Sequence, residues 1–191
     1  MKKRVKIAFN APIVLGFAFF SFWATVSGIL TGNRSTRILF MTYHSSLKNP
    51  MTYLRFFTHV FGHSGWQHLM ANLGYLLLVG PMLEEKYGGK VLAEVMIMTA
   101  LATGLVNYFF FPEVGLCGAS GVVFAFIVLA SFTEFKKGEI PLTFLLVSFI
   151  FIGQQVYDGF AVTDNISNMA HIVGGLIGAV MGYGLNRNSR G

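Results

Sequence analysis

The sequence is short of charge and of cysteine. Charged residues make up only 12% of its 191 residues, whereas about a quarter is usual for a soluble domain. The single cysteine, Cys117, excludes an intramolecular disulfide, so packing must hold the fold together. The lack of charge does not indicate disorder, because 54% of the residues are hydrophobic. Uncharged runs of about 20 residues are long enough for a helix to cross a bilayer. We therefore predict an all-α integral membrane protein.

Six apolar runs predict six transmembrane helices in one domain of residues 11–185. The runs cover residues 11–30, 66–83, 91–111, 115–132, 141–157 and 166–185. The first run is longer than the apolar part of a typical signal peptide and lacks a clear small-residue cleavage site, so we expect it to be retained. Residues 31–65 form a long first loop, whose aromatic part, residues 50–60, is expected at the membrane interface. Charged turns are expected at residues 84–90 and 134–139.

Basic residues predict the orientation of the chain. Residues 1–10 form a basic head and residues 186–191 a basic tail, and six spans place both on the same side of the membrane. That side then carries ten of the 14 basic residues, and the other side carries four. Since cytoplasmic segments carry the excess of Lys and Arg, we predict that both termini are cytoplasmic. The same distribution accounts for the net charge of +6, so we expect no nucleic-acid partner.

Polar residues within membrane spans are costly, and three of the predicted spans carry them. His68 and Asn72 are four residues apart on one helical face, and Asn168 and His171 are three apart. Ser120 follows a glycine-rich stretch. Together these residue types can perform acyl transfer: a hydroxyl attacks, a neutral imidazole takes its proton, and amide, imidazole and backbone N–H groups stabilise the oxyanion. Each residue alone is more often a packing residue, but the combination favours a catalytic site.

Small residues predict close packing of the fourth and sixth spans. They share one helical face in each span: Gly174, Gly178 and Gly182 after His171, and Gly118, Gly121 and Ala125 around Ser120. Such stripes let two helix backbones approach closely. Close approach would bring His171 beside Ser120. Phe124, one turn after Ser120, would share its face and pack against the imidazole.

The acid that would complete a Ser-His-Asp triad is missing. Glu113, Asp158 and Asp164 all fall in predicted loops. In a triad the acid holds the tautomer of the base, and its loss costs about 10⁴-fold in rate. We therefore predict a dyad of Ser120 and His171, in which packing rather than an acid orients the histidine.

Three other interpretations are weaker. His59, His63 and His68 match the number of ligands in a common catalytic zinc set, but only the first two share a helical face and no HExxH pattern accompanies them. Cys117 has no evident base to make it a nucleophile. A channel or transporter would need acids and polar pairs along several helices, and Glu94 is the only acid within a predicted span. We therefore predict no metal and no cofactor.

Four motifs resemble those of the rhomboid intramembrane serine proteases. Gly118-Ala119-Ser120-Gly121 resembles the family's Gly-x-Ser-Gly, and His68-Leu-Met-Ala-Asn72 resembles its His-x-x-x-Asn. Ala170-His171-Ile-Val-Gly174 is similar to the family's Ala-His-x-x-Gly, and Glu84-x-x-x-Gly88 to the acid and glycine that close its second span. The resemblance covers residues 50–185. Each motif alone is weak, whereas the set is specific.

The resemblance implies a six-helix rhomboid-like bundle with a partly membrane-associated first loop. It implies a serine endopeptidase that cleaves peptide bonds within or next to transmembrane segments of other membrane proteins. Ser120 would be the nucleophile and His171 the general base. The oxyanion hole would be formed by His68, Asn72 and the Ser120 backbone N–H. The supporting residues would be Phe124, Gly118, Gly121, Gly174 and Arg55, of which Arg55 would brace the first loop.

The resemblance also implies the surroundings of the protein. Its partners would be membrane-protein substrates and the lipid bilayer, and its location a bacterial inner or plasma membrane. The Phe-rich fifth span, with Phe144, Phe149 and Phe151, would form a lateral gate. Two positions depart from the family pattern: Leu54 stands where Trp often precedes the arginine, and Phe124 where many bacterial members have Tyr. The alternative is a non-catalytic rhomboid-like protein that binds membrane helices; such relatives lack the serine or the histidine, and this chain has both.

Overall fold

The computed structural model of the chain describes residues 7–132, 142–143, 145–146, 149–150, 153 and 165–188. Most of these residues are helical, as predicted. The helices are α1 Pro12–Leu30, α2 Arg34–Leu39, α3 Pro50–Thr58, the 3₁₀ turn η1 His59–Phe61, α4 Trp66–Tyr87, α5 Gly89–Phe110, α6 Ser120–Ser131 and α8 Asn165–Asn188. The one β-type pairing within the described ranges is an isolated antiparallel bridge between Thr42 and Leu116.

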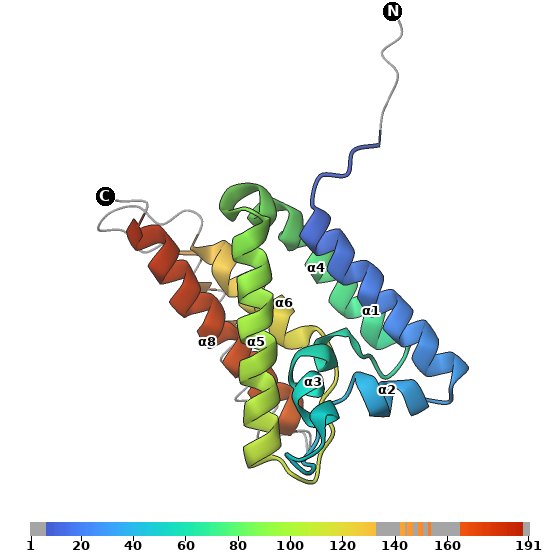
Figure 1. The fold of residues 1–191 in the computed structure, drawn as a ribbon. Helices are drawn as coiled ribbons and strands as arrows, with labels where there is room; N and C mark the ends of the chain where they lie inside the picture. The colour runs from blue at the N-terminus through green and yellow to red at the C-terminus, as the bar shows by residue number, and fades with distance from the viewer. Residues whose placement is uncertain are drawn as a thin grey trace, which may run out of the picture.

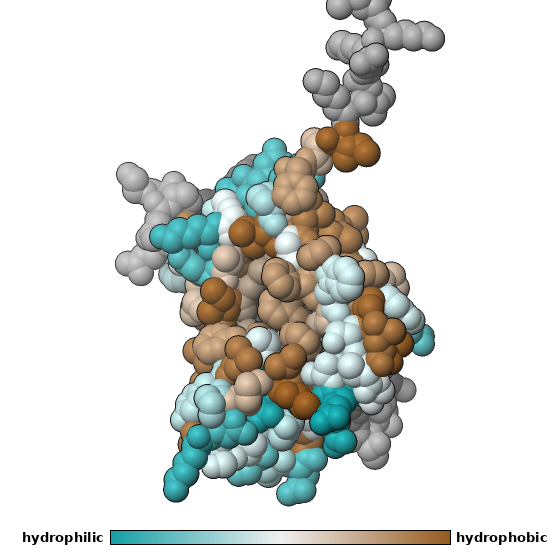
Figure 2. All heavy atoms as spheres, turned by 45° about the vertical axis from the view of Figure 1, so that its right-hand side comes forward, coloured by the Kyte–Doolittle hydropathy of each residue, from teal (hydrophilic) through white to brown (hydrophobic). Residues whose placement is uncertain are grey.

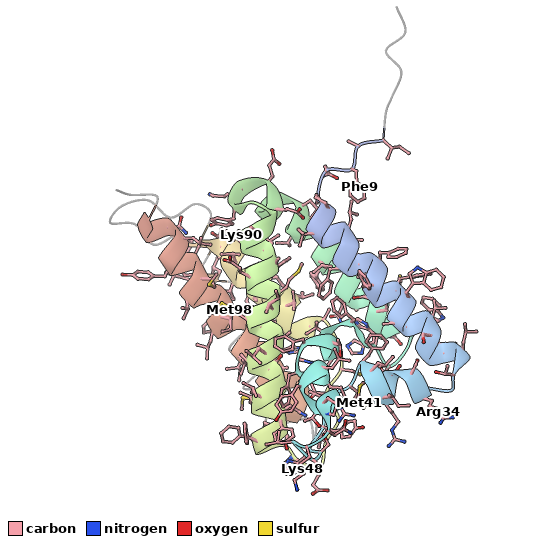
Figure 3. All side chains as sticks on the ribbon, in the orientation of Figure 1. Phe9, Arg34, Met41, Lys48, Lys90 and Met98 are labelled. Carbon is pink, nitrogen blue, oxygen red and sulfur yellow. The ribbon has the colours of Figure 1, made fainter. Side chains whose placement is uncertain are left out.

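Figure 1 shows how the helices are arranged. Helix α5 crosses the bundle between α8 on one side and the pair α1 and α4 on the other, with α6 behind it. The short helices α2 and α3 lie together at one end of the bundle, and the start of α1, the α4–α5 turn and the end of α8 lie at the opposite end. Basic side chains lie at both ends: Arg34 and Lys48 at the end with α2 and α3, and Lys90 at the end with the start of α1 (Figure 3).

The hydrophobic core lies between α1, α4, α5 and α6. Fully buried side chains from these four helices meet there, among them Val14, Leu69, Leu76, Leu92, Val95, Val122 and Phe126. Large apolar side chains on the outer faces are exposed instead: Leu78 of α4 is 69% exposed and Val180 of α8 is 65% exposed. Exposed apolar surface of this kind is typical of contact with a membrane or with another protein. In Figure 2 it forms a brown band between more hydrophilic teal ends.

Three described helical segments are long and apolar enough to cross a membrane: Pro12–Leu30, Gly89–Phe110 and Asn168–Asn186. They match the first, third and sixth predicted spans. Helix α4, with 22 residues, and α6, with 12, occupy the second and fourth. The predicted fifth span lies mostly outside the described residues, which leave out Phe144 and Phe151; the residues of it that are described are helical and exposed, Phe149 among them. The count of six spans therefore stays a prediction.

Glu84 ties the end of α4 to the start of α1. Its buried carboxylate accepts hydrogen bonds from the backbone N–H groups of Ile13 and Val14, both at 3.0 Å. These amides belong to the first turn of α1, where no intrahelical acceptor exists and a negative charge complements the helix dipole. The charged turn predicted at residues 84–90 is wrong in its extent, because α4 continues to Tyr87 and α5 begins at Gly89. Gly88 alone makes the reversal, at a φ of +84° that favours glycine.

The predicted close packing of the fourth and sixth spans is present between α6 and α8. A Cβ atom added to Gly174 would lie 2.1 Å from the carbonyl oxygen of Gly121, and one added to Gly178 would lie 2.3 Å from that of Ala125. Both distances are shorter than van der Waals contact, so only glycine permits the two backbones to come this close. The contact holds α8 against the first turns of α6, the helix that begins with Ser120.

Candidate active site

One cavity collects the polar residues that the sequence analysis singled out. It has a volume of about 380 Å³ and lies between α4, α6 and α8. Its lining consists of His68, Ala71, Asn72, Tyr75, Ser120, Val123, Phe124, Ile127 and His171. The four side chains expected to carry the chemistry are therefore brought together, although they come from three helices that are distant in the sequence.

Ser120 is the first residue of α6. The first amides of a helix have no intrahelical acceptor, so the Ser120 N–H is available to a group in the cavity. The aligned peptide dipoles also place a partial positive charge at this end of the helix. A negative charge that develops beside Ser120 would meet both of these favourable interactions.

His171 lies on α8 with its ring stacked on that of Phe124. The two ring centroids are 4.0 Å apart and the ring planes differ by 3°. The expected packing of Phe124 against the imidazole is thus present in the structure. Such a stack fixes the plane of the imidazole without using either ring nitrogen.

Asn72 lines the cavity and has an unpaired side-chain N–H group. Its side chain is 6% exposed, and its Nδ2 group has no hydrogen-bond partner in the described part of the chain. Leaving a buried N–H unpaired costs about 1–3 kcal/mol, and folded proteins rarely do so. Because Asn72 lines the cavity, an acceptor placed there would satisfy it. The cavity is therefore bordered by a residue whose side-chain donor has no acceptor among the described residues.

His68 faces the loop that precedes α6. A Cβ atom added to Gly118 of that loop would lie 2.8 Å from both Cε1 and Nε2 of His68, and 3.8 Å from Nδ2 of Asn72. Gly118 also has a φ of +134°, which L side chains rarely adopt. The predicted place of Gly118 in the stripe of the fourth span is wrong, because α6 begins only at Ser120. Gly118 instead lets the loop approach the imidazole and the amide of α4.

Arg55 lies on α3, outside the cavity lining. Its side chain is 4% exposed, and its guanidinium donates to the Tyr43 hydroxyl at 2.5 Å and to the Ser45 hydroxyl at 2.9 Å. These bonds attach the chain around residues 43–45 to α3. Leu54, the departure noted beside Arg55, is 43% exposed and takes no part in them.

The histidines considered as metal ligands have partners within the protein. His59 bonds through Nδ1 to a backbone carbonyl of α3 and through Nε2 to the Thr103 hydroxyl, both at 3.1 Å. His63 bonds through Nδ1 to the Phe61 carbonyl at 3.1 Å, and its Nε2 accepts the Ala119 N–H at 3.4 Å. No group of three possible metal ligands occurs within the ranges that the structure describes.

Burial keeps both of these histidines neutral. It lowers the pKa of His59 from 6.5 to about 4. It also lowers the pKa of His63 to about 4, with a further contribution from the nearby His68. For His63 the neutral state has a structural use, since only an unprotonated Nε2 can accept the N–H of Ala119, the residue before Ser120.

Tyr75 and Asn107 were not predicted from the sequence as residues of this region. Tyr75 lines the cavity one turn after Asn72, and its spacing from His68 and Asn72 is the signal that would have found it. Asn107 of α5 donates to the carbonyls of Thr42 and Val114, at 3.3 and 3.1 Å. It thereby joins the first loop to the loop before α6, and no sequence periodicity points to that contact.

Comparisons with known proteins agree with this architecture. A model of the Rhomboid domain matches residues 50–188. Rhomboid-related protein 2 of Mus musculus is 31% identical over 157 residues, which are 72% of this chain and 52% of the relative. Rhomboid-related protein 1 of Caenorhabditis elegans is 28% identical over 172 residues, 85% of this chain and 48% of the relative. Rhomboid protease GlpG of Salmonella paratyphi A is 28% identical over 141 residues, 71% of this chain and 50% of the relative.

The chain spans about half the length of these relatives. The family model, in contrast, covers most of the chain, including α3 to α8 and every residue that lines the cavity. The chain belongs to the rhomboid family of membrane proteins.

Proposed function

We propose that this protein is an intramembrane serine endopeptidase in which Ser120 and His171 form the catalytic dyad. The observation that carries the proposal is the cavity between α4, α6 and α8, which these two residues line together with His68 and Asn72. Membership of the rhomboid family and the similarity to a relative named a rhomboid protease support it.

The first half of the reaction forms an acyl-enzyme. Ser120 Oγ attacks the carbonyl carbon of the scissile peptide while its proton passes to a ring nitrogen of His171. His171 then protonates the leaving amine, the C–N bond breaks, and the N-terminal part of the substrate stays as an ester on Ser120. In the second half His171 takes a proton from a water molecule that attacks the ester, and it returns the proton to Ser120 Oγ as the ester bond breaks. The stack on Phe124 holds the imidazole plane during these proton transfers.

The oxyanion formed in each half needs donors that are already in place. We assign this role to Nε2–H of His68, Nδ2–H of Asn72 and the backbone N–H of Ser120. The oxyanion is the acceptor that Asn72 lacks in the free protein. Loss of one such donor typically costs about 10²–10³ in kcat. None of these steps requires a metal or a cofactor.

Access to the scissile carbonyl constrains the substrate. The carbonyls of an intact membrane helix are bonded within the helix. The substrate must therefore unwind locally and enter as an extended segment. Gly, Pro or polar residues near the cleaved bond would make this unwinding easier, and we expect them in substrates.

The proposed orientation places both termini in the cytoplasm. The start of α1 and the end of α8 lie at the same end of the bundle, together with Lys90 (Figures 1 and 3). The excess of basic residues assigned to this end favours the cytoplasmic side. Ser120 and His68 are near the starts of α6 and α4, so the cavity would lie toward the opposite, outer face.

The proposal is tested by cleavage of a model single-span substrate in detergent or liposomes. We expect Ser120→Ala to reduce cleavage by about 10⁴-fold or more, and His171→Ala to have a similar effect. Ser131→Ala is the matched control, because Ser131 lies on the same helix and its hydroxyl, as far as the described residues go, bonds to the Ile127 carbonyl at 3.0 Å. Cleavage by folded Ser120→Ala at the wild-type rate would overturn the assignment.

A further inference from the structure

Ser64 touches the side of His68 that points away from the loop before α6. Its hydroxyl lies 3.2 Å from Nδ1 of His68, whereas the Cε1 and Nε2 atoms of the same ring face Gly118. Ser64 precedes α4 and stands four residues before His68. The Ser64 hydroxyl is therefore bonded to Nδ1 of His68, whereas Nε2 faces Gly118 and the loop before Ser120.

A hydrogen bond to Nδ1 controls what the other nitrogen can do. If the Ser64 hydroxyl donates to Nδ1, the single proton of the neutral ring resides on Nε2, which then is a donor. The reverse arrangement would direct a lone pair of Nε2 toward the oxyanion. A 180° flip of the ring would put Cε1–H in the position of Nε2–H and would also break the bond to Ser64. The Ser64 contact thus opposes both unproductive states.

We propose that Ser64 is a positioning residue of the oxyanion hole, whose hydroxyl donates to Nδ1 of His68 and keeps Nε2–H directed at the reacting carbonyl. The inference rests on the proposed function. His63 cannot take the same role, although its ring meets that of His68 at 4.9 Å, because its two nitrogens are used by Phe61 and Ala119.

A double-mutant cycle tests this inference. We expect Ser64→Ala to lower kcat by about two- to ten-fold, the range that one neutral hydrogen bond provides, with KM unchanged. Ser64→Thr, which keeps a hydroxyl, should restore the rate. Ser46→Ala is the matched control: Ser46 is also exposed, and its hydroxyl accepts one bond at 3.2 Å, from the Lys48 N–H. In a His68→Ala background, Ser64→Ala should have no further effect, because its target is gone.

Several outcomes would overturn the inference. A Ser64→Ala defect of equal size in the His68→Ala background would mean that Ser64 acts through the start of α4 rather than through His68. A normal kcat in folded Ser64→Ala, or a defect confined to KM, would also reject it. A measurement independent of activity is the ¹⁵N spectrum of histidine-labelled protein, in which His68 should carry its proton on Nε2; a proton on Nδ1 would contradict the inference. Failure of the Ser120→Ala test, in contrast, would reject the proposed function itself.

Discussion

Two buried asparagines, in two regions of the molecule, differ in whether the fold pairs their side-chain donor, although Oδ1 of Asn107 is itself unpaired among the described residues. Asn107 is 2% exposed, and its Nδ2 donates to the carbonyls of Thr42 and Val114. Asn72 is 6% exposed, and its Nδ2 has no partner among the described residues. The first asparagine closes the junction between the first loop and the loop before α6. The second faces the cavity that contains Ser120.

Asn72 differs from the other buried groups without a partner in that it also lines the cavity with Ser120 and His171. A buried donor that the fold satisfies contributes to stability, and its removal leaves its acceptors unpaired. A buried donor without a partner costs stability, and we infer that the fold tolerates this cost because the oxyanion of the reaction supplies the acceptor. The two asparagines should therefore respond in opposite ways to the same substitution.

The largest expected effect is on catalysis in Asn72→Ala. Removing an oxyanion donor should lower kcat by about 10²–10³. The temperature of unfolding should stay the same or rise, because an unpaired buried donor is removed. Cleavage of a model substrate and thermal unfolding in the same detergent would measure both quantities.

Asn107→Ala is the counterpart. It leaves the carbonyls of Thr42 and Val114 without this donor, so we expect a loss of about 1–3 kcal/mol in the free energy of unfolding. Its kcat, measured at a temperature where the variant is folded, should change far less than that of Asn72→Ala. If the two variants lost activity and stability in the same proportions, the distinction between the two regions would fail.

The close backbone contact between α6 and α8 should be needed for the cavity to keep its shape. A Cβ at Gly174 meets the Gly121 carbonyl oxygen at 2.1 Å, so Gly174→Ala must push the helices apart. Overpacking of this kind typically costs about 1–3 kcal/mol, and it should also lower the cleavage rate. Gly184→Ala is the control on the same helix, because a Cβ there meets nothing within 4 Å. A Gly174→Ala protein as stable and active as Gly184→Ala would contradict this packing.

Acid should destabilise the fold through two buried histidines, His59 and His63. In the unfolded chain His59 and His63 bind protons below about pH 6.5, but burial lowers their pKa to about 4 in the folded protein. The unfolded state therefore binds more protons across this window, and stability should fall as the pH drops from 6.5 to about 4, by up to about 3 kcal/mol for each histidine. Unfolding measured across the window should show a shallower slope for His59→Gln, and an unchanged slope would argue against this origin.

The smallest expected effect is that of Cys117→Ala. Burial raises the pKa of the Cys117 thiol to about 11, so little of the reactive thiolate is present at neutral pH. We expect the variant to cleave at a rate within about two-fold of wild type, because Cys117 is only partly buried and lies outside the cavity lining. Alkylation of Cys117 in the folded protein should be slow. Loss of activity in the variant, together with rapid alkylation of Cys117 in the wild type, would indicate that Cys117 is a nucleophile.

The sequence predicted the meeting of Ser120 and His171 because helical spacing determines it. Gly174 and Gly178 define which face of α8 can touch another backbone, and His171 lies on that face. The small residues Gly121 and Ala125 do the same for α6. The small residues of the two helices thus determine the interface of α6 with α8, and the cavity lies beside this interface.

Contacts that depend on loops could not be predicted in this way. Gly118 was expected in a helical stripe, but it lies in a loop at positive φ against His68. Glu84 bonds to α1 amides 70 and 71 residues away, and Ser64 reaches His68 only through the path of the chain before α4. None of these contacts leaves a periodic signal, because each is decided by how whole helices come together.

The most direct test of the dyad is labelling with a fluorophosphonate probe, followed by identification of the modified peptide. We predict one adduct on Ser120 of the folded protein, absent in Ser120→Ala and much slower to form in His171→Ala. An adduct that forms equally in Ser120→Ala, or a folded wild-type protein that does not react at all, would contradict the assignment of Ser120 as an activated nucleophile.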